Sequence, residues 1–472
     1  MAYSATQRSS RWRIRQDERR TILFIGDFLV ACLSLAIALA VWGMRDWLQI
    51  SKELLNERTP NWFYLLPFIW MLLNMEMYDL RRASLRDETV KGIALAAIAS
   101  LALYLFVFFF APKDLPRVAV GVFIFASALL TLGWRFIYIS VFTAPEFLRR
   151  VLIVGAGKAG GTLARVVRAM RTQPFSIVGL IDDDPGKINC QVEGFPVLGG
   201  SESLLAVIER EKITDVIFAI SNEMRPEMFR SLLAAEEQGV EITTMPTIYE
   251  KLFGRVPIML LNSDWILRSF VDHAHASGFY ELVKRLIDIV GGLVGLLISV
   301  ILAPFIVLAI YLDTGFPVFY TQNRLGQNGQ EYTIIKFRTM RKDAEMDGKV
   351  RVTVENDERI TRVGRFLRKS HLDEIPQFIN VLRGEMSLVG PRAERSELVN
   401  ELQERVPFYR ARLLVKSGIT GWAQINFGYA ATVEDTIVKL EYDLYYIKHR
   451  NLLLDGMIML RSIGTVIGFK GQ

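Results

Sequence analysis

Four apolar stretches in the first 150 residues constrain this chain more than any other feature of its sequence. They lie at about 21–44, 62–79, 90–111 and 118–142. Each is close to the ~20 residues that a helix needs to cross the hydrocarbon core of a bilayer. The first is too long for a signal peptide and is followed by further apolar stretches. We therefore predict a basic segment over residues 1–20 and a bundle of four transmembrane helices over residues 21–150.

Basic residues are distributed unevenly among the predicted loops. The segment before the first span and the loop between the second and third spans are rich in arginine, whereas the next loop offers only Lys113 and Arg117. The positive-inside rule then places both ends of the bundle in the cytosol. Asp27 lies about two turns inside the first span. An acid there is either functional or a packing residue that faces Arg19 or Arg20.

The composition agrees with membrane segments joined to charged domains. Hydrophobic residues make up 51% of the chain, charged residues 22%, and the net charge is +6. No nucleic-acid-binding motif accompanies the positive charge, so membrane lipids and phosphorylated substrates are the expected partners. Cys32 and Cys190 are the two cysteines, and their positions argue against a disulfide or a metal site.

Residues 151–252 have the pattern of a Rossmann-like α/β domain. A β-type run, Val151–Ile153, leads into a glycine turn that contains Gly155, Gly157 and Gly160, followed by a helical stretch. A second strand then ends in three consecutive aspartates at 182–184. Such a turn can hold a pyrophosphate at the helix N-terminus, and the acid can bond a ribose hydroxyl. The three glycines are therefore candidate cofactor-binding residues, although tight packing alone also explains them.

This domain raises two alternatives. A membrane-anchored nucleotide-sugar dehydratase or epimerase using NAD would need a Tyr-x-x-x-Lys pair, and Tyr280 and Lys284 match that spacing. A membrane segment begins directly afterwards, however, where such an enzyme should build its sugar pocket. A channel or sensor with a ligand-gated Rossmann domain would leave the last 200 residues without a role.

A fifth apolar segment, 286–312, follows a linker over residues 253–285. As a helix, its uncharged part would reach ~36 Å, enough to cross a bilayer. Pro304 interrupts it, and proline removes a helix hydrogen bond and favours a kink. Basic residues also flank both ends, with Lys284 before it and Arg324 after it. We therefore predict a re-entrant helix that enters and leaves on the same side.

The last 190 residues combine an acidic pair with many bases. Asp373 and Glu374 stand in Leu-Asp-Glu-Ile-Pro-Gln, after Lys-Phe-Arg-Thr-Met and before Ser-Leu-Val-Gly-Pro-Arg. Adjacent carboxylates can divide the work of nucleophile and Mg²⁺ ligand. Arginine and lysine bind phosphate oxygens. The candidate phosphate- and substrate-binding residues are Lys336, Arg338, Arg368, Gln377 and Arg392.

These motifs resemble, in order and spacing, those of the bacterial sugar transferase family, the monotopic polyprenyl-phosphate hexose-1-phosphate transferases. The likeness is specific over about 280–472, and it includes Gly-Ile-Thr-Gly-Trp-Ala-Gln at 418–424. The four spans and the degenerate Rossmann-like domain resemble the large members of the family. The resemblance therefore implies a mainly α catalytic domain over residues 286–472.

The resemblance implies a two-step reaction at a bacterial inner membrane. Asp373 would attack the β-phosphate of a UDP-sugar, release UMP and carry a phosphosugar, which undecaprenyl phosphate would then accept. Glu374 would hold Mg²⁺. The sugar would be a hexose, with glucose the first choice, and the product would start an exopolysaccharide, a capsule or an O-antigen. The middle and catalytic domains would be cytosolic, and a homodimer is compatible with the family.

Three positions depart from the family pattern. The family's Ser-Pro at the kink is Ala303-Pro304, so no serine hydroxyl is available there to stabilise the turn. Ala393 follows Arg392 where the family has proline. The family's Lys-Pro-Gly is Lys-Ser-Gly here, with Ser417 in place of the proline. The last two changes remove loop stiffness and leave the charged residues in place.

Overall fold

The computed structural model describes residues 16–45, 51, 53–78, 80–110, 116–142, 148–220, 224–261, 278–341, 357–428 and 432–467. The chain forms two compact units that divide between Thr243 and Thr244. The first unit contains the N-terminal helices and a small sheet, and the second contains the C-terminal motifs.

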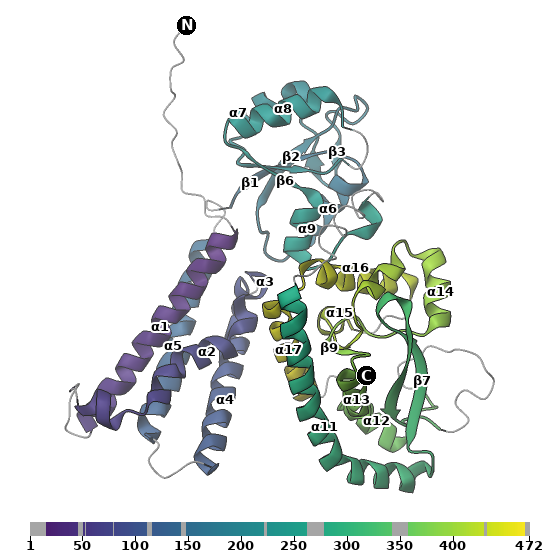
Figure 1. The fold of residues 1–472 in the computed structure, drawn as a ribbon. Helices are drawn as coiled ribbons and strands as arrows, with labels where there is room; N and C mark the ends of the chain where they lie inside the picture. Colours follow the sequence, from purple (N-terminus) through teal and green to yellow (C-terminus); the bar gives the residue numbers. More distant parts are fainter. Residues whose placement is uncertain are drawn as a thin grey trace. The chain divides into compact units, whose positions relative to one another are not determined.

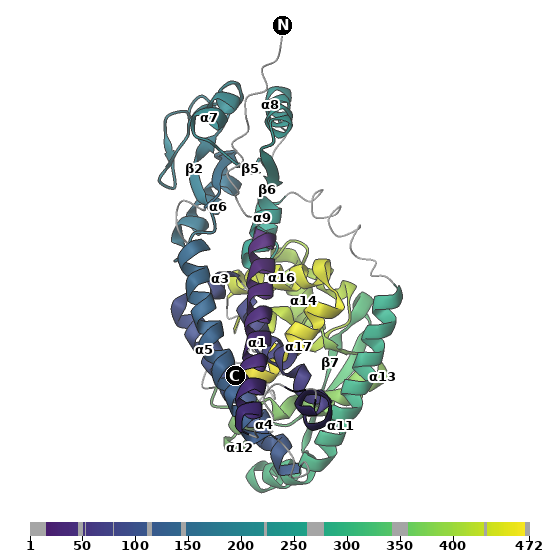
Figure 2. The same cartoon turned by 90° about the vertical axis from the view of Figure 1, so that its left-hand side faces the viewer.

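Three of the four expected N-terminal spans are long apolar helices, α1 (Gln16–Arg45), α4 (Arg86–Phe110) and α5 (Arg117–Phe142). Each has the length and composition needed to cross a membrane. Figure 2 shows α1 and α5 running side by side. Between them the bundle buries a core of small and aromatic residues that includes Ala31, Ala38, Phe63, Trp70 and Phe123.

The second expected span, 62–79, is not one continuous helix. Its residues form a 3₁₀ turn (Asn61–Leu65), α2 (Leu66–Leu73) and a second 3₁₀ turn (Met75–Tyr78), before the short α3 (Leu80–Ala83). Pro67 lies in the first turn of α2, and the side-chain amide of Asn74 donates to the Trp70 carbonyl at its end. Laid end to end, these pieces would reach about 30 Å, so the expected second crossing stays a prediction.

The acid in the first span has a different partner from the one expected. The Asp27 carboxylate pairs with Arg135 of α5 at 2.5 Å, and both side chains are fully buried. Arg135 also donates to the Met77 carbonyl at 2.8 Å. Arg19, one of the two expected partners, donates instead to the Phe142 carbonyl at 3.3 Å. Asp27 is therefore a packing residue that joins α1 to α5, because a buried charge requires a partner within reach.

The middle domain is a four-stranded sheet in the order β2-β1-β5-β6, with β1 parallel to both of its neighbours. Its strands are β1 (Arg150–Val154), β2 (Ser176–Ile181), β5 (Asp215–Phe218) and β6 (Glu241–Thr244), with a small hairpin of β3 (Gln191–Val192) and β4 (Phe195–Pro196). Figure 1 shows α7 (Leu204–Arg210) and α8 (Pro226–Glu237) on one face of the sheet and α6 (Lys158–Ala169) on the other. This is the layering of an α/β domain.

The domain boundary differs from the expected residue 252. Helix α9 (Met245–Phe253) and the segment after it belong to the C-terminal unit. Val256 and Ile258 are fully buried in that unit's main core, and Lys448 bonds both oxygens of Glu250. Apolar spacing predicts a helix but does not say which core covers it. Residues 262–277 of the expected linker lie outside the described residues. Its last part, 278–285, is not a linker but the first turns of a long helix, α11 (Gly278–Thr314).

The C-terminal unit is mainly helical around one hairpin and one short parallel pair of strands. The hairpin joins β7 (Phe319–Leu325) to β8 (Glu331–Phe337), and β9 (Ser387–Val389) pairs with β10 (Gly418–Thr420). The helices after the hairpin are α12 (Arg362–Lys369), α13 (Phe378–Arg383), α14 (Ser396–Arg405), α15 (Trp422–Asn426), α16 (Val433–His449) and α17 (Leu452–Ile467). The described 3₁₀ helices of the unit are η6 (Ile258–Leu260), η7 (Gln327–Gly329), η8 (Leu372–Gln377) and η9 (Tyr409–Leu414).

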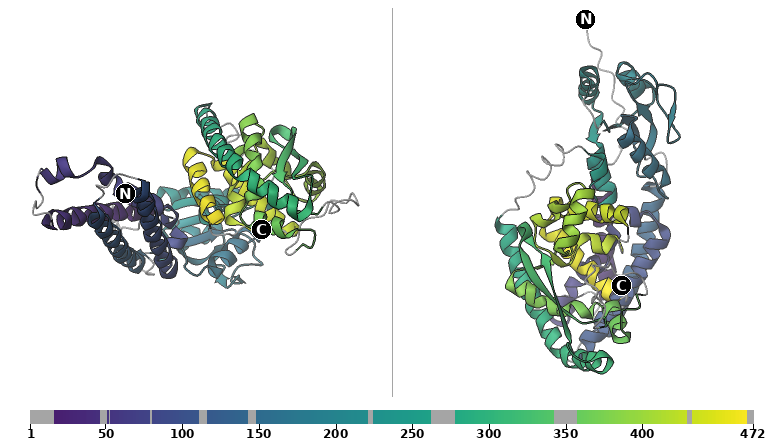
Figure 3. Two further views of the ribbon diagram at one scale, coloured as in Figure 1. Left: turned by 90° about the horizontal axis from the view of Figure 1, so that it is seen from below. Right: turned by 90° about the vertical axis from the view of Figure 1, so that its right-hand side faces the viewer.

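Helix α11 (Gly278–Thr314) is the long apolar helix of this unit and contains Pro304. Figures 1 and 3 show its axis turning sharply toward its C-terminal end. The part before Pro304 packs on α13 and β9, and the part after it packs on Phe337 and Leu367 through Ile306 and Ile310. Both arms therefore contact the same folded unit. The outer face of the helix exposes large apolar residues, among them Leu297, Ile301, Phe305, Leu308 and Leu312.

Candidate active site

The β7–β8 hairpin places Lys336 on the face that is turned toward the core of the C-terminal unit. Along β8 the buried or half-buried side chains include Ile334 and Lys336, and the paired residues of β7 on the same face are Gln322 and Tyr320. Side chains alternate between the two faces of a strand, so this spacing directs Lys336 toward the core of the unit. Its ammonium group lies 2.7 Å from Oε1 of Glu374.

The acidic pair lies in the first turn of η8, directly after His371, whose φ is +56°. Both carboxylates are more than nine-tenths buried. Oε1 of Glu374 accepts hydrogen bonds from Lys336 at 2.7 Å and from Arg392 at 2.8 Å. Asp373 has no ion pair among the residues that the structure describes. The two neighbouring carboxylates therefore have different surroundings.

Their electrostatics differ in the same way. Burial disfavours the charged form of both acids, but Arg392 and Lys336 outweigh it at Glu374 and hold the pKa of that carboxyl well below its usual range. Burial raises the pKa of Asp373, and the negative charge of Glu374 raises it further. Glu374 is thus a fixed anion neutralised by two bases, and Asp373 is the more basic carboxylate of the pair.

The structure gathers four of the candidate residues around one cleft. Lys336, Glu374, Gln377 and Arg392 line it together with apolar side chains of β8 and β10. The side chain of Gln377 is 2% exposed, and its Nε2 has no hydrogen-bond partner within the described part of the chain. A buried donor without a partner is costly, so this amide is available to a ligand oxygen.

Arg368 and Arg338 occupy different places. The Nε of Arg368 donates to the Thr339 hydroxyl at 2.9 Å, and its guanidinium is close enough to Asp373 to interact with that charge. Arg338 points instead at the end of α11, where it donates to the Gly315 carbonyl at 2.6 Å. The structure therefore does not bring Arg338 into the cleft of Glu374. Its contact caps a helix end whose carbonyls lack partners within the helix.

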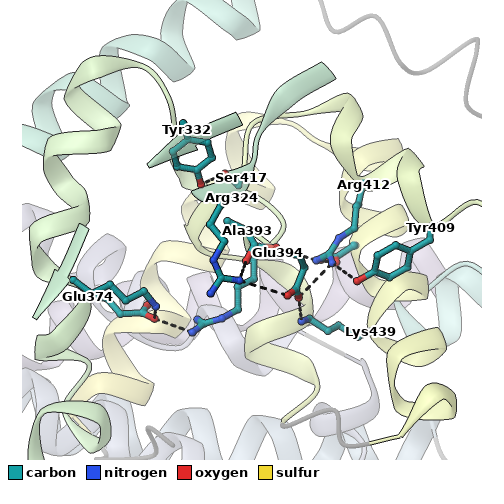
Figure 4. Close-up of polar contacts among 12 residues, drawn as sticks. Arg324, Tyr332, Glu374, Ala393, Glu394, Tyr409, Arg412, Ser417 and Lys439 are labelled. Carbon is teal, nitrogen blue, oxygen red and sulfur yellow. Dashed lines mark hydrogen bonds and ion pairs between the residues drawn. The ribbon is translucent and has the colours of Figure 1, made fainter. Parts of the chain in front are cut away.

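A second charged cluster, which the sequence did not indicate, adjoins the cleft. Glu394 accepts from Lys439 at 2.8 Å and pairs with Arg412 at 3.4 Å, while Arg412 also bonds Asp443 at 2.8 Å. Figure 4 shows Glu394 between Arg412 and Arg324. Burial disfavours ionisation of Glu394, but Lys439, Arg412 and Arg324 outweigh it and lower its pKa to about 2. In the sequence, the position of Glu394 two residues after Arg392 was a weak indication of this cluster.

Side chains of α11 hold the acidic turn in place. The Ser299 hydroxyl donates to the carbonyls of Gly295 at 2.7 Å and of Ile375 at 3.1 Å. Asp288 accepts from the Ser387 hydroxyl and the Leu388 amide, both at 2.9 Å. Ser299 lies one turn before Ala303, where the family pattern has serine. A hydroxyl on this stretch of the helix thus contacts the turn that carries Asp373 and Glu374.

Small residues on the same face of α11 allow this close approach. A Cβ at Gly291 would meet Leu388 at 2.5 Å, and one at Gly295 would meet the Phe378 ring at 2.5 Å. The four-residue spacing of Gly291 and Gly295 therefore serves packing within the unit.

The Tyr280 and Lys284 pair does not form a dehydratase site. Tyr280 donates to Asp455 at 2.9 Å, and Lys284 bonds the same oxygen at 2.9 Å. Tyr446 bonds the other oxygen of Asp455 at 2.8 Å. The pair therefore joins α11 to α16 and α17, and its polar groups are used within that cluster.

The glycine turn of the middle domain is closed partly by its own backbone and by the Asp182 carboxylate. Gly155 has φ +109°, and a Cβ at Gly160 would lie 1.9 Å from the Gly155 carbonyl oxygen, so both serve the fold. Of the three glycines Gly155, Gly157 and Gly160, only Gly157 faces open space. The Asp182 carboxylate accepts from the Ala156 amide at 2.7 Å and from the Asp184 amide at 2.9 Å. The acid expected to meet a ribose instead bonds the turn itself.

The candidate site is thus a cleft in which two bases pair with one carboxylate. A second and more basic carboxylate lies beside it, and the long apolar helix α11 packs against the turn that carries both. The family model described as bacterial sugar transferase matches residues 279–469, and a model described as a CoA-binding domain matches 74–246. A UDP-glucose:undecaprenyl-phosphate glucose-1-phosphate transferase of Escherichia coli is 42% identical over 339 residues, which cover 68% of each chain. The chain belongs to the bacterial sugar transferase family.

The alignments with two further relatives cover a smaller share of each relative's length. A UDP-N-acetylgalactosamine-undecaprenyl-phosphate N-acetylgalactosaminephosphotransferase of Aeromonas hydrophila is 37% identical over 53% of this chain and 58% of its own. A UDP-glucose:undecaprenyl-phosphate glucose-1-phosphate transferase of Xanthomonas campestris is 30% identical over 59% of this chain and 58% of its own. The chain thus spans somewhat more than half the length of these two relatives. Their names differ in the sugar.

Proposed function

We propose that this protein transfers a hexose 1-phosphate from a UDP-sugar to undecaprenyl phosphate, with release of UMP. The observation that carries the proposal is the pairing of Glu374 with Lys336 and Arg392. Beside it lies the buried Asp373, which has no ion pair within the described part of the chain. The names of the relatives support the same reaction class. The motif residues that make this site lie within the part of the chain that the sugar transferase model matches.

The roles of the two acids follow from their contacts. Glu374 has one oxygen engaged by two bases and is a poor nucleophile, because its charge is already neutralised. Asp373 keeps its oxygens for a reaction. An oxygen of Asp373 attacks the β-phosphorus, a new P–O bond forms, and the bond from that phosphorus to the bridging oxygen breaks as UMP leaves. A phosphate oxygen of the lipid then attacks the same phosphorus and releases Asp373.

The remaining cleft residues position and neutralise the transferred group. Lys336 and Arg392 balance charge on the phosphoryl oxygens, and the free amide of Gln377 can donate to an oxygen of the substrate. Arg368, near Asp373, adds positive charge on the side of the nucleophile. Charge balance and orientation supply most of the rate in phosphoryl transfer, since the protein has little covalent chemistry to perform.

Magnesium fits this donor set as a substrate-bound ion. The described residues hold no cluster of three or more acidic, histidine or cysteine side chains that could form an all-protein cage. Mg²⁺ commonly takes one or two carboxylates together with substrate phosphates and waters. Both bases bond Oε1 of Glu374, which leaves Oε2 as a ligand atom. We therefore propose that Glu374 holds Mg²⁺, which would neutralise the diphosphate.

The shape of α11 supports a re-entrant membrane helix. Residues before and after Pro304 pack on one folded unit, which a straight crossing of ~30 Å of hydrocarbon would separate. The outward apolar face suits contact with acyl chains. The site would then lie at the cytosolic surface, where the phosphate of a polyprenyl lipid can reach it.

A panel of UDP-sugars with undecaprenyl phosphate tests the proposed reaction. We expect UMP release coupled to a lipid-linked sugar, with UDP-glucose as the first donor to try and UDP-N-acetylgalactosamine and UDP-galactose beside it. The competing dehydratase would instead form a keto-sugar and turn over nicotinamide. A keto-sugar product without UMP would exclude the proposal. The engagement of Tyr280 and Lys284 by Asp455 argues against that outcome.

Topology can be tested by cysteine labelling in whole cells. Single cysteines at Glu281, in the first turn of α11, and at Asn323, on β7 after the end of α11, are both exposed. Both should react with a membrane-impermeant maleimide only after lysis. The background replaces Cys32 and Cys190. A protein that keeps only Cys190, which is exposed in the middle domain, is the matched control for the cytosolic side. Labelling of residue 323 in intact cells would show that α11 crosses, and the proposed position of the site would be wrong.

A further inference from the structure

Arg324 is a third base at the cleft, and the proposed reaction does not yet use it. It lies on β7 opposite Tyr332, on the same face of the hairpin as Lys336. Its side chain is 17% exposed and lines the cleft with Lys336, Glu374 and Arg392. Figure 4 shows its guanidinium between Glu374 and Glu394.

Arg324 is less fully paired than its two neighbours. Lys336 and Arg392 each lie within 2.8 Å of a Glu374 oxygen. The closest carboxylate oxygen to Arg324 belongs to Glu394 and is 3.9 Å away, and one N–H donates to the Ala393 carbonyl at 3.3 Å. Its buried Nε has no partner within the described residues. An arginine held in this way keeps donors for an anionic ligand.

The Glu394 cluster explains how this guanidinium is held. Lys439 and Arg412 fix Glu394, and Arg412 is fixed in turn by Asp443 and by the Arg392 carbonyl. Glu394 stays ionised through the physiological range, because its pKa is about 2. A fixed anion beside Arg324 orients the guanidinium without neutralising it fully. Glu394 is therefore a positioning residue.

Bases outnumber acids among the side chains that line the cleft. The bases are Arg324, Lys336 and Arg392, and the acid is Glu374. Each phosphate of a sugar nucleotide carries one ionised oxygen near neutral pH. Lys336 and Arg392 stand beside the acidic pair, where the transferred phosphate reacts. Arg324 contacts the Ala393 and Glu394 side of the cleft instead.

We propose that Arg324 binds the phosphate that leaves with the nucleotide. This inference rests on the proposed function. When Asp373 attacks the β-phosphorus, the electron pair of the broken P–O bond goes to the bridging oxygen, which departs as part of UMP. Arg324 donates hydrogen bonds to the phosphate that carries this oxygen and balances its new charge. Strong donors aimed at developing charge lower the barrier for such a step.

Inhibition by UMP and by uridine isolates this contact, because the two ligands differ only in the phosphate. In the full-length enzyme we expect Arg324→Gln to raise the UMP inhibition constant about 10- to 100-fold, the range for loss of a charged hydrogen bond. The uridine constant should not change. Arg324→Lys keeps a point charge and should raise the UMP constant by a smaller factor. Arg405→Gln, an exposed arginine of α14, is the matched control and should change neither constant.

The outcomes separate the two proposals. An unchanged UMP constant in folded Arg324→Gln would overturn the assignment, and so would equal weakening of UMP and uridine, which would indicate a general change of the pocket. Where Arg324→Gln does not fold, an unchanged UMP constant in Arg324→Lys overturns it equally. A natural enzyme that neither releases UMP nor is inhibited by it would instead reject the proposed function itself.

Discussion

Replacing Asp373 with asparagine is expected to reduce sugar-phosphate transfer by about 1,000-fold or more, as loss of a covalent step generally does. Asparagine keeps the size of the side chain and removes the anionic oxygen that forms the P–O bond in the proposed mechanism. The buried position should tolerate this change, because Asp373 has no ion pair among the described residues. Folding can be checked by chromatography in detergent before activity is measured.

The matched variant is Glu374→Gln, which lies next to Asp373 and loses the same charge. It should also be severely impaired, but for a different reason, because Lys336 and Arg392 lose their shared anion and Mg²⁺ loses a ligand. High Mg²⁺ should restore part of its activity and none of that of Asp373→Asn. Mass spectrometry of enzyme quenched with UDP-sugar alone should find the phosphosugar on Asp373. An adduct on Glu374, or UMP exchange that survives in Asp373→Asn, would refute the assignment.

Replacing Arg135, which pairs with the buried Asp27, should destabilise the N-terminal bundle more than any other single change. Arg135→Leu leaves Asp27 charged among apolar side chains, and breaking a buried ion pair from one side typically costs ~3–5 kcal/mol. Arg135 also satisfies the Met77 carbonyl, which would lose its donor. The free energy of unfolding in mixed micelles measures this loss.

The double variant Asp27→Leu/Arg135→Leu is the control, because replacing both members of a buried pair with apolar residues is often close to neutral. It should recover most of the stability and should retain transfer, since Asp27 is assigned to packing. Loss of transfer in a double variant with normal stability would instead give Asp27 or Arg135 a functional role.

Motifs with several charged residues at fixed spacing were the most predictable part of the site. Lys336, Glu374 and Arg392 lie 56 positions apart at most, and the structure brings all three together. Arg338 belongs to the same motif as Lys336 but caps the end of α11. The motif therefore identified which residues lie near the site. It did not show that Arg338 would point away, because that depends on the unpaired carbonyls at the end of α11.

Other features could not be found from sequence because they depend on tertiary contacts. Apolar composition alone identified 62–79 as a span, yet Pro67 and Asn74 divide it into short pieces. Asp27 was expected to face a nearby arginine and instead pairs with one 108 residues away. Arg324 and Glu394 resemble ordinary charged surface residues until the fold places them at the cleft.

The bend of α11 has a consequence for the lipids around it. In the proposed re-entrant arrangement, α11 displaces acyl chains from one leaflet only, so its insertion expands that leaflet relative to the other. The carrier lipid would enter from the same leaflet, and its product would return there. Under the proposed topology, the lipid-linked sugar therefore remains on the side of the membrane where it forms, and a separate protein must carry it across.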